Sequence, residues 1–380
     1  MATGEVRKRL GLIVNPIAGM GGRVGLKGTD GAAILAEARR RGAVPVAHGR
    51  ARRALDALGR EDAAFDLLAV AGAMGEADAL ACGLSPRIVV VGGAETTAED
   101  TRDAARAMAD AGVDLLLFAG GDGTARDVFD AVGDRVAVLG IPTGVKMQSA
   151  VFANGPEAAG RLAGLALAGR ATETRLAEVM DIDEAAMVWG RLSARLYGHA
   201  RVPVARGLTQ AAKSGGGAGG DDALDALARR LARTMEVGRL YILGPGTTTA
   251  RIRAALGLGN GLSGDLLAID AVRDGAPAGV DLDEAGLLDL IDDRGASILV
   301  SVIGGQGFVL GRGNQAISAA VLRRAGTENL VVLASLEKLL ALPDRVLRVD
   351  TGDPATDRAL EGYIRVLTGP DRSTMMRIAA

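Results

Sequence analysis

The chain has 380 residues, 48% of them hydrophobic and 24% charged, so it is long enough for two globular domains and too apolar to be disordered. A formal net charge of −2 and an aromatic content of 2% argue against nucleic-acid binding, which needs a basic surface and stacking platforms. One cysteine and two histidines exclude an intramolecular disulfide and are too few for a zinc site built on those ligands.

The N-terminal apolar run stops at Asn15-Pro16, which leaves it too short for the core of a signal peptide. No uncharged apolar run approaches the roughly 18 residues of a membrane span. We therefore expect a cytoplasmic protein without a membrane partner.

The first half of the chain alternates strand-like and helix-like segments. The apolar runs predict strands at residues 11–14, 44–47, 66–71, 87–91, 113–119 and 135–139. Helical patterns are clearest at residues 32–41, 97–111 and 124–132. This alternation predicts an α/β domain with a parallel, Rossmann-like sheet, in which ligands bind outside the carboxyl ends of the strands.

The loop after the first strand, residues 15–30, is long and rich in glycine. Loops of this length are usually functional or disordered, and lysine in such a loop favours phosphate contact. It is not a Walker A loop, because the required spacing of glycine and lysine is absent. The alternative is a glycine-rich flap that binds nothing. The candidate phosphate contacts are Asn15, Gly19, Gly21, Gly22 and Lys27.

The motif Gly120-Gly121-Asp122-Gly123-Thr124 follows a strand-length apolar run and precedes a helical pattern. Its glycines permit a sharp turn and close approach to a ligand, and a helix start offers free N–H groups to a phosphate. Thr124 and Asp127 have the spacing of a capping box. Asp122 is expected between the phosphate site and solvent. The alternative is a tight turn with a solvated aspartate.

A third loop, residues 140–147, follows the last strand of this half. Pro142 fixes the backbone, Gly144 permits close approach and Lys146 can reach an anion, with Thr143 beside them. We expect the first domain to end near residue 150.

The second half loses the strand–helix rhythm, and strands are predicted at residues 178–182, 186–189 and 194–204. Further on, residues 239–243 predict a strand that leads into Gly244-Pro245-Gly246-Thr247-Thr248-Thr249 and a helix at 250–256, which again favours ligand binding at a helix start. The stretch 304–315 follows a buried strand and contains Arg312 and Asn314 as candidates for contacts with ligand phosphate or amide groups.

Taken together, the GGDGT motif, the loops at 14–22 and 140–146, and the stretch 305–315 resemble the ATP-NAD kinase family, in the branch that includes the AcoX proteins of acetoin catabolism. The resemblance runs from about residue 10 to about residue 369. It implies an N-terminal α/β nucleotide-binding domain at 1–150 and a β-rich acceptor-binding domain at 151–380. It also implies that the protein phosphorylates NAD to NADP with ATP as the donor.

In the family that the sequence resembles, the aspartate matching Asp122 activates the 2′-hydroxyl of the adenosine ribose. The resemblance further implies Mg²⁺ held mainly by nucleotide phosphates, with no dedicated metal ligands in the protein. The expected partners are therefore small molecules, and a homo-oligomer, dimer or tetramer, is implied as well. The phosphate cradle would comprise the loop residues named above together with Gly120, Gly121, Gly123, Thr124, Thr143, Gly144 and Lys146.

The sequence departs from the family where an Asn-Glu pair usually grips the acceptor. An acidic cluster stands there instead, in which Asp181 or Glu184 could take that role or form a solvated hairpin. The remaining acceptor candidates are Gly246, Thr247, Thr248, Thr249, Arg312 and Asn314. This departure leaves open a kinase for another small hydroxyl compound, such as a polyol, nucleoside or lipid. A non-catalytic nucleotide-binding regulator stays open too.

Overall fold

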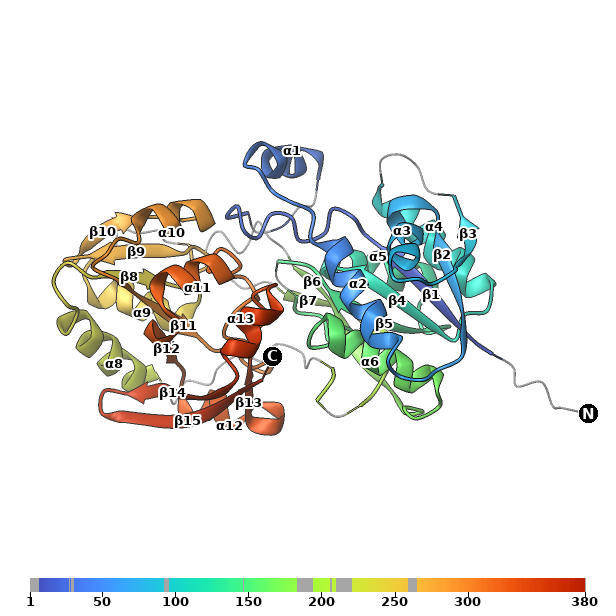
Figure 1. Cartoon of the computed structure of the whole chain (residues 1–380). Helices are drawn as coiled ribbons and strands as arrows, with labels where there is room; N and C mark the ends of the chain where they lie inside the picture. Colours follow the sequence, from blue (N-terminus) through green and yellow to red (C-terminus); the bar gives the residue numbers. More distant parts are fainter. Residues whose placement is uncertain are drawn as a thin grey trace, which may run out of the picture.

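The computed structural model describes residues 7–26, 28, 31–91, 96–145, 147–182, 194–205, 207–209, 221–258 and 265–379, which form two lobes side by side (Figure 1). The first lobe contains a five-stranded sheet of order β3-β2-β1-β4-β5, and every pairing in it is parallel. Its strands are β1 (Lys8–Val14), β2 (Phe65–Val70), β3 (Arg87–Val90), β4 (Leu115–Gly120) and β5 (Ala137–Pro142). The predicted parallel sheet is confirmed.

Helices connect these strands, as the alternation in the sequence predicts. They are α1 (Ala32–Arg40), α2 (Ala47–Leu58), α3 (Glu76–Ala81), α4 (Ala98–Asp110), α5 (Asp122–Val132) and α6 (Pro156–Leu167). The strand predicted at 44–47 is wrong, since the chain is irregular there and then begins α2. The apolar residues that follow recur with helical spacing and are buried, at Ala47, Ala51, Ala54, Leu55 and Leu58. This longer helical pattern outweighs the short apolar run at 44–47, which Pro45 interrupts.

A two-stranded antiparallel hairpin, β6 (Thr174–Ile182) and β7 (Ala194–Pro203), follows α6. The strand predicted at 186–189 lies outside the described residues. The buried hairpin residues, Ala177, Val179, Ala200 and Val202, belong to the hydrophobic core of the first sheet. The hydrophobic core therefore groups α6 and the β6–β7 hairpin with the first lobe. The domain boundary expected at residue 150 stays a prediction.

The second lobe is built on an eight-stranded mixed sheet of order β10-β9-β8-β11-β12-β14-β15-β13. Its strands are β8 (Leu240–Leu243), β9 (Asp270–Arg273), β10 (Ala276–Gly279), β11 (Ala296–Ser301), β12 (Leu330–Leu333), β13 (Val346–Arg348), β14 (Gly362–Gly369) and β15 (Arg372–Ala379). The helices are α8 (Asp221–Arg233), α9 (Thr247–Ala255), α10 (Glu284–Leu290), α11 (Ala319–Ala325), α12 (Leu336–Leu340) and α13 (Pro354–Ala359). The predicted strand-rich second half is confirmed.

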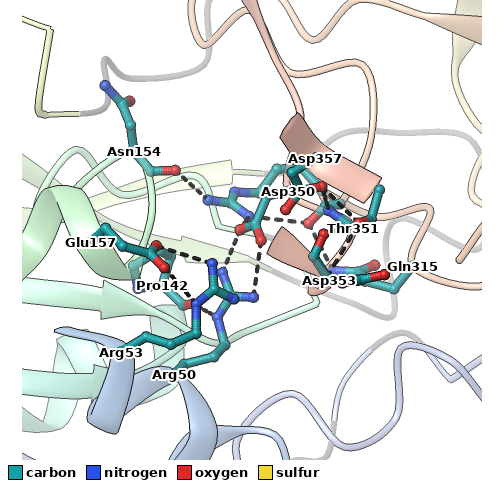
Figure 2. A network of polar contacts seen from close by, with 12 residues as sticks. Arg50, Arg53, Pro142, Asn154, Glu157, Gln315, Asp350, Thr351, Asp353 and Asp357 are labelled. Carbon is teal, nitrogen blue, oxygen red and sulfur yellow. Dashed lines mark hydrogen bonds and ion pairs between the residues drawn. The ribbon is translucent and has the colours of Figure 1, made fainter. Parts of the chain in front are cut away.

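A buried ion-pair network joins the two lobes (Figure 2). Asp350, which follows β13, accepts hydrogen bonds from Arg50 of α2 at 3.0 Å and from Arg312 at 2.7 Å. Arg50 also donates to the backbone oxygen of Pro142, and Arg312 donates to that of Asn154 at 3.2 Å. Burial alone would raise the pKa of Asp350, but the two guanidinium groups outweigh it and hold that pKa well below its usual range. Two arginines from different lobes thus share one buried carboxylate.

We predict that Asp350→Asn destabilises the protein by about 3–5 kcal/mol, because it leaves two buried guanidinium groups without a counter-ion. Since the pKa of Asp350 is lowered, its contribution is complete above the ordinary aspartate pKa and is lost only as the pH falls through the lowered value. The loss should therefore be constant between about pH 5 and pH 8.

Urea unfolding followed by circular dichroism measures this difference. The matched control is Asp353→Asn, since Asp353 pairs with the 60% exposed Arg323 and Asn caps α13 as well as Asp does. Equal stability of the two variants would show that the Asp350 network does not hold the lobes together.

Candidate active site

The carboxyl ends of β1 and β4 lie where the strand order of the first sheet reverses, which is the usual ligand site of such sheets. Asn15 follows β1, and its backbone N–H donates to Ala119 of β4 at 2.9 Å. The Asn15 side-chain Nδ2 donates to Thr124 Oγ1 at 3.0 Å. The structure therefore brings the first glycine-rich loop and the GGDGT motif together at this point.

The capping box predicted for Thr124 and Asp127 is wrong. Helix α5 begins two residues earlier than expected, at Asp122, and its N-cap Gly121 makes no side-chain cap hydrogen bond. The Thr124 hydroxyl instead bonds Asn15, and Asp127 pairs with Arg102 of α4 at 2.5 Å. The side chains of Thr124 and Asp127, which local spacing predicted to cap the helix, thus bond residues far away in the chain.

The motif glycines serve close packing. The sharp turn expected at the motif is present, since Gly121 alone separates the end of β4 from the start of α5. Gly121 has a φ of −113°, an ordinary extended value, so the turn does not need left-handed backbone there. A Cβ at Gly120 would lie 2.3 Å from the Thr124 side chain, and one at Gly121 would lie 3.1 Å from the Gly144 Cα. The N–H groups of Thr143 and Gly144 donate to the Gly120 oxygen at 3.0 and 3.3 Å. The third predicted loop is therefore in direct contact with the motif.

Asp122 is the first residue of α5 and is buried, with 8% of its surface exposed. Its two carboxylate oxygens accept from the backbone N–H groups of Gln148 at 2.8 Å and Ser149 at 3.0 Å. Burial raises the pKa of Asp122, while these N–H groups, the Ser149 side chain and the charge of Arg126 act in the opposite direction. Asp122 therefore lies inside the structure, whereas it was expected between the phosphate site and solvent. An ionised carboxylate has about four lone-pair sites, so Asp122 can still accept a hydrogen bond from a ligand hydroxyl.

A cleft of about 990 Å³ opens beside the motif, at the carboxyl ends of β1, β2 and β4. One end is polar, with Asn15 after β1 and with Gly123 and Thr124 in the first turn of α5. The rest of the lining is largely apolar, with Ile17, Met20, Leu35 and Met74 among its side chains. Such a cleft, mostly apolar with a few convergent polar groups, has the size and character of a small-molecule site.

Two cations of this cleft, Arg39 and Arg126, were missed by the sequence reading. Arg126 stands four residues after Asp122, so helical spacing places both on one side of α5, and that spacing was an available signal. Lys27 and Lys146, the lysines expected at the phosphates, lie outside the described residues. The Thr143 hydroxyl is buried and, in the described part of the chain, has no hydrogen-bond partner.

The glycine-rich loop packs between the lobes. A Cβ at Gly19 would lie 1.8 Å from the Thr143 oxygen, and one at Gly22 would lie 3.1 Å from Gln315 of the second lobe. The Gly21 oxygen accepts from Leu26 N–H at 2.9 Å, which closes the loop on itself. These contacts favour a built binding loop over an inert flap, and its phosphate contacts stay a prediction.

The acceptor candidates are not gathered at one place. Gly246, Thr247, Thr248 and Thr249 form the start of α9 at the carboxyl end of β8, where the Thr249 hydroxyl donates to the Gly246 oxygen at 3.0 Å. Arg312 is occupied by Asp350, and Asn314 holds its own turn by bonds to Gly311 and Val309. Asp181 lies in β6 without a described side chain, and Glu184 lies outside the described residues.

Glutamine side chains of the second lobe were also missed. Gln306 Nε2 donates to the Met147 oxygen at 2.9 Å, and Gln315 Nε2 donates to the Val145 oxygen at 2.6 Å. The stretch 304–315 therefore hydrogen-bonds the backbone next to Gln148 and Ser149, the two residues that hold Asp122. The second lobe thus contributes to the candidate site.

Within the ranges that the structure describes, no group of three or more His, Cys, Asp or Glu side chains could hold a metal ion. Within those same ranges, no helix is long and apolar enough to cross a membrane.

Sequence models of two domains match the chain. Residues 10–171 match the ATP-NAD kinase N-terminal domain, and residues 238–378 match the ATP-NAD kinase C-terminal domain. The first match covers the five-stranded sheet and the second covers nearly all of the eight-stranded sheet. A comparison with curated proteins finds no match. The chain belongs to the ATP-NAD kinase family, and its class is therefore that of a kinase-type phosphotransferase.

We predict that Gly120→Ala disrupts the cradle, because its Cβ would clash with Thr124 and force apart the contact with Asn15. Overpacking of this kind costs about 1–3 kcal/mol and shifts neighbouring atoms. Nucleotide binding measured by calorimetry should weaken by at least tenfold, and thermal unfolding should occur at a lower temperature.

Gly155→Ala is the matched control, since a Cβ there would meet no described atom within 4 Å. It should bind nucleotide like the wild type. Unchanged nucleotide affinity in Gly120→Ala would remove the motif backbone from the binding site.

Proposed function

We propose that this protein transfers the γ-phosphoryl group of ATP to the 2′-hydroxyl of the adenosine ribose of NAD, forming NADP. The observation that carries the proposal is the position of Asp122. Its carboxylate lies at the start of α5, next to the cleft residues Gly123 and Thr124. It is hydrogen-bonded to the segment 147–150, which the second lobe contacts through a hydrogen bond from Gln306. This position supports Asp122 as a base that would act between a nucleotide in the cleft and the other lobe.

The donor nucleotide would occupy the cleft of the first lobe. The first turn of α5 has N–H groups without helical partners, and its dipole favours phosphate there. Arg39 and Arg126 line the same cleft and supply positive charge. The free Thr143 hydroxyl lies in the loop bonded to Gly120 and can donate to a phosphate oxygen.

Phosphoryl transfer needs positioning and charge stabilisation more than covalent chemistry from the protein. When bound, Mg²⁺ would neutralise charge on the phosphates. The described residues fit a cation that is held mainly by the nucleotide and water, with Asp127 as the carboxylate that lines the cleft. Asp122 would accept the proton of the attacking hydroxyl. Its two backbone hydrogen bonds fix the direction of its free lone pairs.

The acceptor would bind between the lobes, on the side of Asp122 that faces the segment 147–150. NAD is the leading acceptor because of the family and the intact GGDGT motif. The missing Asn-Glu pair favours, as a second candidate, a kinase of the same fold for a polyol, nucleoside or lipid hydroxyl. A non-catalytic, AcoX-like nucleotide-binding regulator is the third reading, and a base held beside the cleft argues against it.

We predict NADP formation from NAD, ATP and Mg²⁺ by the wild type. Turnover in Asp122→Asn should be lower by about 10² or more, as expected when a general base is removed. ATP affinity measured by calorimetry should change much less. Asp130→Asn is the matched control, since Asp130 lies on the same helix, accepts a hydrogen bond from Tyr197 at 2.7 Å and is not among the described residues that line the cleft.

The same assay is run with polyol, nucleoside and lipid acceptors. If the wild type makes no more NADP than Asp122→Asn while still binding ATP, NAD is the wrong acceptor and the other acceptors decide between a kinase and a regulator. Wild-type turnover in Asp122→Asn would instead remove Asp122 from the reaction.

We also propose a homo-oligomer, a dimer or tetramer, on the basis of the family. Leu176 and Leu196 of the β6–β7 hairpin are 64% and 49% exposed and offer an apolar surface for a second copy. Light scattering of the active protein should give a mass at least twice that of one chain. An active monomer would contradict this.

A further inference from the structure

A histidine–aspartate pair lies on the wall of the cleft, apart from the glycine loops. His48, in the first turn of α2, lines the cleft, and its Nδ1 lies 2.8 Å from Asp78 Oδ2 of α3. Asp78 is fully buried, and its other oxygen accepts from Arg52 Nε at 2.9 Å. Burying a carboxylate is costly unless it is paired and hydrogen-bonded, so both partners are needed to hold it there.

This pairing fixes which nitrogen of His48 faces the cleft. The carboxylate accepts from Nδ1–H, so a neutral imidazole presents Nε2 as an acceptor. The His48 side chain is 27% exposed, and within the described residues Nε2 has no hydrogen-bond partner. Arg52 already supplies a permanent positive charge to Asp78. The pair is therefore built to accept a hydrogen bond from a molecule in the cleft.

The position of His48 indicates which part of the molecule it meets. The start of α5 follows β4, whereas Met74 follows β2 and His48 is bonded to Asp78 of α3, which also follows β2. Strand β1 lies between β2 and β4. Two strand spacings amount to about 10 Å. A nucleotide whose phosphates sit at α5 would extend over β1 and place its nucleoside toward His48. The lining there is apolar at Pro45 and Met74, as suits a base or sugar.

We propose that His48, held by Asp78, is a recognition residue that accepts a hydrogen bond from the nucleoside part of the donor nucleotide. The donor of that bond is a ribose hydroxyl or an exocyclic amino group. A fully ionised phosphate carries no hydrogen-bond donor, so Nε2 in this state does not bind the phosphates. This inference deepens the proposed function and rests on it, because it assumes a nucleotide in the cleft.

The test compares ATP with inorganic tripolyphosphate, which has the phosphates but no nucleoside. His48→Asn keeps an amide near the Nδ1 position but cannot reach the Nε2 position, whereas His48→Gln places an amide oxygen near Nε2. In calorimetry with Mg²⁺, His48→Asn should weaken ATP binding about tenfold and leave tripolyphosphate binding unchanged. His48→Gln should stay within about threefold of wild type for both.

Kinetics give a second readout that a merely structural role would not produce. KM for ATP should rise about tenfold in His48→Asn, while kcat changes less than threefold, because the bond is made equally in ground and transition states. Arg52→Gln is the structural control. It disturbs the same buried carboxylate but does not line the cleft, so it should lower stability without separating ATP from tripolyphosphate.

Equal weakening of both ligands in His48→Asn, or of neither, overturns the role of His48 and leaves the nucleotide cleft in place. Binding of neither ligand by the wild type means that the proposed function itself fails, and the role of His48 falls with it. If His48→Asn behaves as expected, 2′-deoxy-ATP and ITP identify the donor, since each lacks one of the two groups.

Discussion

Two backbone N–H groups, from Gln148 and Ser149, hold the Asp122 carboxylate, and the arrangement of the site depends on this contact. The carboxylate is buried, so it is stable there only because its charge is hydrogen-bonded. The Ser149 hydroxyl in turn accepts from Met180 N–H of β6 at 2.9 Å, and Met147 accepts from Gln306 of the second lobe. One short segment therefore connects the motif, the hairpin and the second lobe.

The two lobes contribute different parts of the candidate site. Among the described residues, those that line the cleft at α5 all belong to the first lobe, whereas Asp122 is bonded to a segment that both lobes hold. In the proposed function, donor recognition and acceptor recognition would therefore rest on different residues. A changed acceptor pocket can change the preference for one acceptor over another by a large factor, because polar groups left unpaired disfavour the wrong ligand. The phosphate cradle would stay the same. The Arg50–Asp350–Arg312 network holds the lobes in the required relation.

Much of the fold could be predicted because its signals are local. Leucine-rich runs of strand length followed by glycine identify the strands of the first sheet and the loops at their carboxyl ends. What failed depended on partners far away in the chain. Thr124 has a capping pattern, but Asn15, 109 residues away, takes its hydroxyl. Arg312 looks like a ligand contact, but Asp350 and the buried surroundings occupy it.

The pair of His48 and Asp78 illustrates the same limit. The two residues are 30 positions apart, on different helices, and no spacing rule connects them. Only the packing of α2 against α3 at the end of β2 brings them together. Sequence patterns thus locate the backbone of a binding site, while the side chains that complete it depend on how the elements pack.

In the proposed function, Asp122 receives a proton from an acceptor hydroxyl while a nucleotide fills the cleft of the first lobe. A crystal structure of the full chain with Mg²⁺, a non-hydrolysable ATP analogue and NAD tests this most directly. We predict phosphates at Gly123 and Thr124, and the 2′-hydroxyl within hydrogen-bond reach of Asp122, about 2.6–3.2 Å. A nucleotide bound outside this cleft, or an acceptor hydroxyl held away from Asp122 by another group, would contradict it.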